Sequence, residues 1–122
     1  MIELRKSIKD LLDTTCSIVY HMRATETKGY PYLVYNMTSV FYDGEGTATV
    51  SLEVDGWDKD FDTLRIETLM SNVRIALDKA VINKDDFSVV FYLESNLHIG
   101  DPEPDIQRIQ HTYTGKLIER RQ

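Results

Sequence analysis

Apolar residues recur along the chain in two patterns that predict amphipathic helices. Near the N-terminus they are spaced three and four apart between charged residues, at Ile2, Leu4, Ile8, Leu11 and Leu12, which is the period of a helix with one buried face. A second stripe predicts a helix of about five turns, because the period of 3.6 residues continues to residue 80. Asp58 or Asp60 is expected to cap its start. This second stripe comprises Phe61, Leu64, Ile66, Leu69, Val73, Ala76, Leu77 and Ala80.

Shorter segments alternate between apolar and polar residues or are rich in β-branched and aromatic residues, which predicts strands. They cover residues 17–22, 32–41, 47–55, 87–97 and 106–120. Asp43-Gly44-Glu45-Gly46 joins the second and third of these segments and predicts a β-hairpin turn. We therefore expect one α+β domain spanning residues 1–122, with a mostly antiparallel sheet, two helices packed on one face, and the order α-β-β-β-α-β-β.

Composition narrows the class of protein further. The chain of 122 residues has the length of one domain and holds a single cysteine, Cys16, so an internal disulfide is excluded. No apolar run is long enough for a membrane span, and the charged first ten residues lack a signal region. With 14 basic and 20 acidic residues the net charge is −6, which argues against a general nucleic-acid binder. From these features alone we expect a cytoplasmic protein.

The excess acid lies almost entirely between residues 43 and 62, which hold seven acidic residues and only Lys59 as a base. One interpretation is a pair of solvated turns flanking a strand. The other is a negative surface that repels a polyanion such as DNA. Because an extended strand separates the two halves of this stretch, we expect two acidic patches at opposite ends of the strand.

Motifs for catalysis or metal binding are missing. The histidines and the cysteine lack the close pairwise spacing of a zinc site, and the acids at 58, 60 and 62 are followed by Thr63 and Leu69 where a calcium loop needs Gly and Glu. Nucleophile elbows, phosphate-binding loops and dinucleotide fingerprints are absent. We expect no enzyme, no cofactor and no bound metal.

The order of elements resembles that of the tail-terminator and tail-completion, or head-to-tail joining, proteins of long-tailed bacteriophages. The resemblance spans essentially the whole chain, from the N-terminal amphipathic helix to the last strand. Its landmarks are Tyr30-Pro31-Tyr32 before a long strand, Asp55-Gly56-Trp57 at the end of the hairpin, and Asp101-Pro102-Glu103 before the last strand.

This resemblance implies a non-enzymatic virion assembly protein of a phage or prophage that forms a six-fold ring on the tail tube. Its partners would be further copies of itself, the tail tube protein and a head completion or connector protein. Genomic DNA would pass through the lumen without specific binding, and no membrane would be involved. The location implied is the tail–head interface of the virion, after assembly in the bacterial cytoplasm.

Two sets of residues are candidates for these contacts. The candidate interface with subunits, tube or connector comprises Lys28, Tyr30, Tyr32, His98, Asp101, Glu103, Asp105, Arg120 and Arg121. The candidate lumen acids, which would repel DNA phosphates, are Asp43, Glu45, Asp55 and Asp58.

Two alternatives stay open. One is another neck or minor tail structural protein of similar fold. The other is a small-ligand-binding or enzymatic α+β domain, which would need a concave pocket with convergent polar groups and a perturbed ionisable residue. A large pocket around His111, Tyr113 and Cys16 would favour the second alternative.

Overall fold

The computed structural model describes residues 2–22 and 29–120 of the chain. Two helices and six strands follow one another in the order α-β-β-β-α-β-β-β. Their bounds are α1 Ile2–Asp13, β1 Val19–His21, β2 Tyr32–Tyr42, β3 Thr47–Lys59, α2 Leu64–Leu77, β4 Val81–Asn83, β5 Phe87–Ile99 and β6 Ile106–Glu119.

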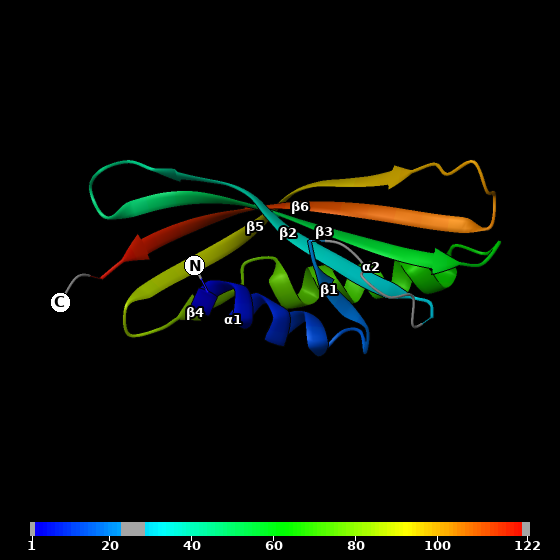
Figure 1. Ribbon diagram of the computed structural model, residues 1–122, viewed down its shortest axis with the longest axis horizontal. Helices are drawn as coiled ribbons and strands as arrows, with labels where there is room; N and C mark the ends of the chain where they lie inside the picture. Colours follow the sequence, from blue (N-terminus) through cyan, green and yellow to red (C-terminus); the bar gives the residue numbers. More distant parts are fainter. Residues whose placement is uncertain (1, 23–28, 121–122) are drawn as a thin grey trace.

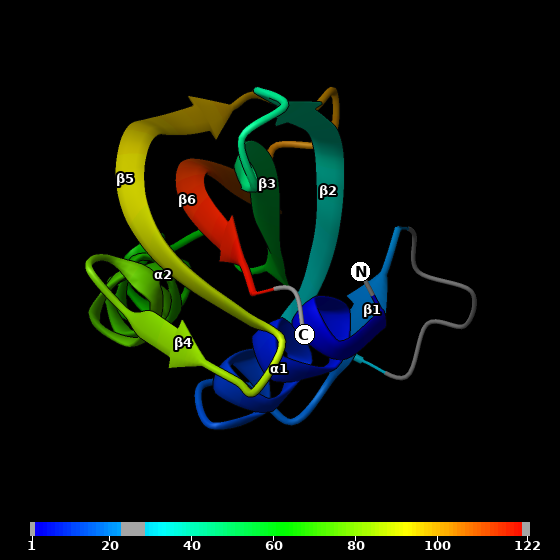
Figure 2. The same ribbon diagram turned by 90° about the vertical axis from the view of Figure 1, so that its left-hand side faces the viewer.

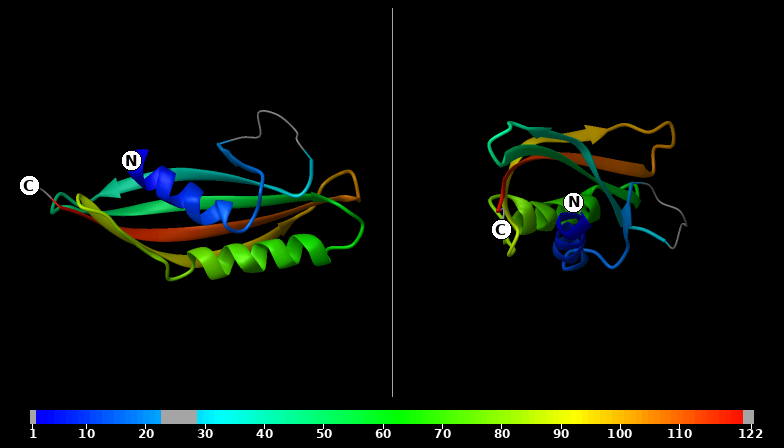
Figure 3. Two further views of the ribbon diagram at one scale, coloured as in Figure 1. Left: turned by 90° about the horizontal axis from the view of Figure 1, so that it is seen from below. Right: turned by 60° about the vertical axis from the view of Figure 1, so that its left-hand side comes forward.

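The six strands form one sheet in the spatial order β1-β2-β3-β6-β5-β4. β1 runs parallel to β2, and the other four pairings are antiparallel, so the sheet is mixed. Its strands curl into a half-barrel, and both helices lie in the hollow (Figures 1 and 2). Seen from below, α2 follows the long axis of the half-barrel and α1 runs obliquely beside it (Figure 3).

The predicted fold class was therefore wrong. The chain has one strand more than expected, β1 makes the sheet mixed, and the sheet is a curled half-barrel instead of an open antiparallel layer. β4 was missed because its three residues follow the apolar stripe of α2 directly and are too short for a strand pattern. The parallel direction of β1 leaves no mark on the sequence, since side-chain alternation is the same in both directions.

The start of the second helix also differs from the prediction. Asp58 lies in β3, and α2 begins only at Leu64, with Thr63 at the N-cap position making no side-chain hydrogen bond. Asp62 Oδ1 instead accepts a hydrogen bond from Leu64 N–H at 2.9 Å. Neither Asp58 nor Asp60 caps the helix, because the strand continues four residues beyond the predicted end at residue 55.

The core lies between the concave side of the sheet and the two helices. The predicted alternation in β3 is confirmed, because Ala48, Val50, Leu52 and Val54 are all buried. Gly115 of β6 is the register partner of Phe91 of β5, whose ring is fully buried and lies close to the Gly115 backbone. The helices contribute the buried residues Leu4, Ile8, Leu12, Ile66, Leu69, Met70, Val73 and Leu77.

Replacement of Gly115 by alanine is expected to destabilise the protein by about 1–3 kcal/mol, the usual cost of overpacking a core. A Cβ at this position would lie 2.6 Å from Cε1 and 2.9 Å from Cδ1 of Phe91. Gly100→Ala is the matched control, since its Cβ would have no neighbour within 4 Å. Urea denaturation of the two variants measures the difference, and equal midpoints would contradict the packing described.

Candidate functional site

The half-barrel has two ends at which the candidate residues gather (Figure 1). We call the end with residues 43–46 the hairpin end and the end with residues 100–105 the loop end. At the hairpin end Asp43 and Glu45 are exposed. Asp43 Oδ1 accepts hydrogen bonds from Glu45 N–H at 2.9 Å and Thr47 N–H at 3.3 Å, so this carboxylate also shapes the turn.

Asp55 and Asp58, the other two candidate lumen acids, are held in ion pairs, Asp58 fully buried and Asp55 partly buried. Asp58 is 0% exposed, and both of its carboxylate oxygens accept hydrogen bonds from the guanidinium of Arg65. Asp55 Oδ2 accepts two hydrogen bonds from Arg108, one of them from Nε at 3.0 Å. Neither acid therefore presents an uncompensated negative charge. Asp43 and Glu45 remain as the exposed members of this set.

The loop end holds a second acidic patch. Asp60 N–H donates to Asp105 O at 2.7 Å, which joins the segment before α2 to the loop before β6. Asp101 and Glu103 are exposed in the same loop, with Asp101 Oδ1 accepting from Glu103 N–H at 3.0 Å. His98 is exposed beside them and donates from Nε2 to Gln107 Oε1 at 3.0 Å. Four of the candidate interface residues are thus neighbours at one end.

Tyr30 and Tyr32 belong to an aromatic ladder on the outer side of the sheet. The rings of Tyr32 and Trp57 are stacked with centroids 6.2 Å apart, and those of Tyr30 and Tyr32 are 5.5 Å apart. Arg108 is the register partner of Trp57 on β6, and its guanidinium carbon lies 4.8 Å from the Trp57 ring centroid. Such a cation–π contact adds about 0.5–1 kcal/mol where it is exposed. Lys28 and Arg121 lie outside the described residues.

Arg120 lies at the hairpin end, away from Tyr32 and His98 at the loop end. Its guanidinium donates to the backbone oxygens of Lys84 and Phe87 and to the side chains of Asn83 and Ser88. These acceptors are uncharged, so its positive charge is not cancelled by them. The hairpin end therefore combines exposed acids with a base, whereas the loop end is acidic.

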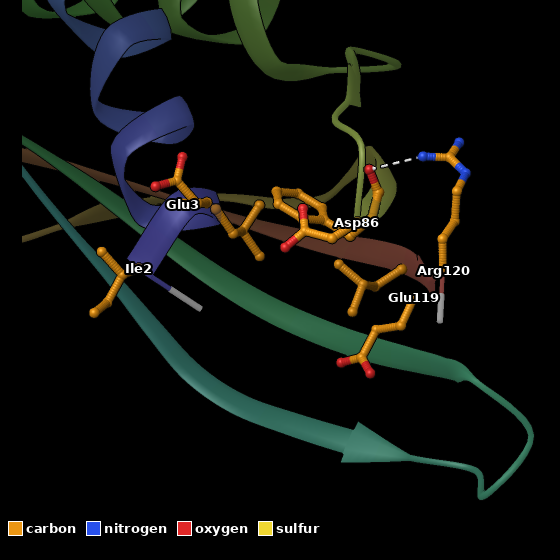
Figure 4. A pocket seen from close by; sticks show the side chains of 8 residues that line it. Ile2, Glu3, Asp86, Glu119 and Arg120 are labelled. Carbon is orange, nitrogen blue, oxygen red and sulfur yellow. Dashed lines mark hydrogen bonds between the residues drawn. The ribbon is translucent and has the colours of Figure 1, made fainter. Parts of the chain in front are cut away.

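A groove of about 440 Å³ opens at the hairpin end between the start of α1, the turn before β5 and the end of β6 (Figure 4). Leu4, Phe87 and Leu117 form its apolar lining, and Ile2 is 61% exposed at its mouth. Acidic side chains and Arg120 surround this lining. Of the groove residues, only Arg120 was predicted from the sequence as a candidate interface residue. The others come from segments that are distant along the chain, so the sequence gives no sign that they lie together.

A smaller cleft of about 280 Å³ lies between α2 and the strands β5 and β6. His111, which is 1% exposed, contributes to its wall together with Arg74 and His98. His111 Nδ1 is 2.9 Å from the Tyr113 hydroxyl. Burial and the nearby Arg74 guanidinium lower the pKa of His111 to about 4, so its imidazole is neutral at pH 7.

Cys16 does not take part in this cleft. Its thiol donates to the backbone oxygens of Ile18 and Pro31, at 3.4 and 3.6 Å. The pocket considered from sequence thus brings His111 and Tyr113 together without Cys16. Arg74 was missed because an exposed arginine on a helix carries no signal of its own until the packing partner of that helix is known.

Short outer strands leave half of each sheet edge without a neighbour among the described residues. β1 pairs with residues 33–35 of β2, and β4 pairs with residues 88–90 of β5. The remainder of β2, residues 36–42, contains no charged side chain. Exposed edges of this kind are templates for pairing with another strand.

Backbone hydrogen bonds identify which β2 residues face the open edge. Leu33 N–H donates to Ile18 O at 3.0 Å, and Tyr35 O accepts from Met22 N–H at 2.8 Å. The backbones of Leu33 and Tyr35 therefore face β1. Alternation along an antiparallel strand, shifted by one at the irregularity in residues 37–39, then directs the backbones of Val40 and Tyr42 outward.

The same reasoning applies to β5. Phe91 N–H donates to Ala80 O, next to β4, at 3.1 Å, and Leu93 N–H donates to Asp78 Oδ1 at 2.9 Å. Both backbones therefore face away from β6. After the irregularity in residues 93–95, the outward backbones are those of Asn96 and His98. The two open edges belong to opposite ends of the half-barrel, β2 to the hairpin end and β5 to the loop end (Figure 1).

No helix in the described residues is long and apolar enough to cross a membrane. Within the same residues, no group of three or more His, Cys, Asp or Glu side chains is arranged to hold a metal ion.

Comparisons with known proteins give one informative result. No family model and no curated protein matches the sequence. Among solved structures, the fold is similar to that of a chain in the structure described as "Virion of native gene transfer agent (GTA) particle", with a TM-score of 0.74 and 14% identity. The match covers 93% of this chain and 92% of that chain. The protein therefore shares its fold, over nearly its whole length, with a chain in the structure of a gene transfer agent virion.

The neutral buried imidazole makes stability depend on pH. Unfolded His111 has a pKa near 6.5, and in the folded protein its pKa is about 4, so the unfolded state takes up this proton first as the pH falls. The contribution is fully present above pH 6.5 and is lost between about pH 6.5 and 4. From pH 7 to pH 5 this residue alone is expected to cost about 2 kcal/mol.

Urea denaturation of the wild type and His111→Gln at pH 5, 7 and 8 measures that contribution. The variant should lose about 2 kcal/mol less than the wild type between pH 7 and pH 5. Between pH 8 and 7 the difference between the two proteins should stay constant, which serves as the internal control. Parallel pH profiles across the whole range would contradict a buried neutral His111.

Proposed function

We propose that this protein is a tail-terminator or head-to-tail joining protein that closes as a six-membered ring on the tail tube of a phage-like particle. The observation that carries the proposal is the fold shared with a gene transfer agent virion chain over 93% of the length. It agrees with the resemblance of the element order to tail-terminator and tail-completion proteins. The role is structural and not enzymatic, and its partners are the tail tube protein, a head connector protein and other copies of itself.

The open sheet edges support assembly into a ring. A ring of identical subunits needs two different surfaces that complement each other, one at each side of the subunit. The open halves of β2 and β5 meet this requirement, since they differ in sequence and belong to opposite ends. β2 and β5 run antiparallel to each other within the sheet. Two neighbouring subunits in the same orientation would therefore pair the open edge of β2 in one subunit with the open edge of β5 in the next as antiparallel strands.

Arg120 is a basic group of the hairpin end that could meet the acidic loop end. The loop end carries Asp60, Asp62, Asp101 and Glu103, and the hydrogen-bond acceptors of Arg120 are uncharged. In an end-to-end arrangement Arg120 would pair with this acidic patch, while the exposed Asp43 and Glu45 of the hairpin end would have to face away from it.

Asp43 and Glu45 are the residues that we propose for the lumen. Repeated around a ring, their exposed carboxylates would repel the phosphates of passing DNA, so that the genome moves without specific binding. Asp55 and Asp58 are less suited to this role, because each is paired with an arginine. A ring structure with Asp43 and Glu45 on its outer rim would refute the lumen role.

Prolines at the outward-facing edge positions are expected to weaken the ring. Tyr42→Pro removes an N–H that faces the open edge and leaves the bonds to β3 in place, which is where a strand tolerates proline. Tyr42→Ala removes the same exposed side chain but keeps the N–H, and His98→Pro with His98→Ala forms the corresponding pair on β5. We expect each proline to cost about 1 kcal/mol at every interface.

Native mass spectrometry and complementation of a particle lacking the gene measure the loss, with urea denaturation as the control for folding. Both readouts are needed because a tube end can template a ring that does not form free in solution. Equal assembly by the proline and alanine members of each pair would refute edge pairing.

Negative-stain microscopy of lysates from a phage or prophage without this gene tests the function itself. Tail tubes of excess length beside filled heads are expected for a terminator. Tails of normal length detached from heads are expected for a joining protein. Ordinary infectious virions would refute both roles.

A further inference from the structure

The cleft between α2 and the strands β5 and β6 is lined mainly by groups that donate hydrogen bonds. Arg74 contributes a guanidinium, Ser71 a hydroxyl and Asn96 an amide, and Glu67 is the acid among the lining residues. Met70 and Ile109 are buried and form an apolar base. The remaining lining residues are His98 and His111.

The hydrogen-bond partner of Tyr113 fixes the tautomer of His111. Tyr113 is 0% exposed, and His111 Nδ1, at 2.9 Å, is the hydrogen-bond partner of its hydroxyl among the described residues. A buried hydroxyl needs an acceptor, so Tyr113 donates and Nδ1 accepts. In a neutral imidazole the remaining proton is then on Nε2. Burial also raises the pKa of Tyr113, which keeps its hydroxyl protonated.

His111 Nε2–H is consequently a buried donor that has no acceptor among the described residues. Leaving such a group unpaired costs about 1–3 kcal/mol, and buried polar groups in native proteins nearly always have a partner. His111 borders the cleft. An occupant of the cleft with an acceptor atom would remove this cost.

Arg74 supplies the charge that selects the occupant. Its guanidinium is 60% exposed and only loosely paired with Asp78, at 3.8 Å. The planar fork of a guanidinium matches a carboxylate and forms stronger hydrogen bonds with it than with a neutral acceptor. Glu67, Arg74 and His98 are the charged or titratable side chains that share the cleft with His111.

We propose that this cleft binds a carboxylate group, which accepts a hydrogen bond from His111 Nε2–H and pairs with the Arg74 guanidinium. The carboxylate comes either from the C-terminus of a partner polypeptide or from a small free carboxylate. The argument for this site uses no assembly contact, although Asn96 and His98 of its lining also lie on the open edge of β5.

Titration of the protein with acetate and with N-acetylglycine, followed by the imidazole ¹⁵N and ¹H signals of His111 in NMR spectra at pH 7, tests the proposal. Both probes should shift these signals saturably. N-acetylglycinamide, which has no carboxylate, should not shift them. Ionic strength is held constant with potassium chloride. An equal shift of the His111 signals on titration with potassium chloride alone would overturn the proposal.

Variants separate binding in the cleft from general attraction of anions. Arg74→Gln should weaken binding at least tenfold and Arg74→Lys should restore part of it, because only the charge remains in the lysine variant. Lys116→Gln, which removes one positive charge from the exposed outer face of β6, should bind as the wild type does. Equal weakening by Arg74→Gln and Lys116→Gln would overturn the proposal.

The two probes distinguish the source of the carboxylate. Binding of N-acetylglycine at least tenfold tighter than acetate indicates the C-terminus of a polypeptide, and equal binding indicates a small carboxylate. Both results support the site. Failure of both probes to shift the His111 signals, or equal binding of N-acetylglycinamide, would overturn it while leaving the proposed virion role untouched.

Discussion

The pairing of β3 with β6 is the constraint on which the rest of the structure depends. Thirteen consecutive residue pairs, from Thr47 opposite Ile118 to Lys59 opposite Ile106, form without a register shift. This central ribbon sets the length of the half-barrel and separates its two ends. β2 and β5 join its two sides, and both bend away where their registers shift, whereas the ribbon itself stays continuous.

Each functional feature follows from this ribbon. The alternation of β3 and β6 turns one row of side chains toward the helices, including His111, and the other row outward, including Arg108 and Trp57. Because the hairpin turn and the acidic loop extend from opposite ends of the same ribbon, the chain has two chemically different ends. The asymmetry of the ends that a closed ring requires is therefore a property of the fold.

The sequence predicts the local elements well and their assembly poorly. Periodicity identifies α1, the four long strands and α2, whose stripe extends beyond both ends of the helix, because amphipathic patterns depend on neighbouring residues alone. It misses β4, the parallel direction of β1 and the curl of the sheet, which depend on contacts between distant segments. The same limit applies to the site: Asp55 and Arg108 are 53 residues apart, so sequence alone gives no sign that the candidate acid is paired.

The aromatic ladder gives the protein a built-in optical probe. The chain contains one tryptophan, Trp57, between Tyr32 on β2 and Arg108 on β6. Its fluorescence therefore reports the packing of three adjacent strands at the loop end and is insensitive to the hairpin end. Emission changes on assembly would identify events at one end of the subunit without any introduced label.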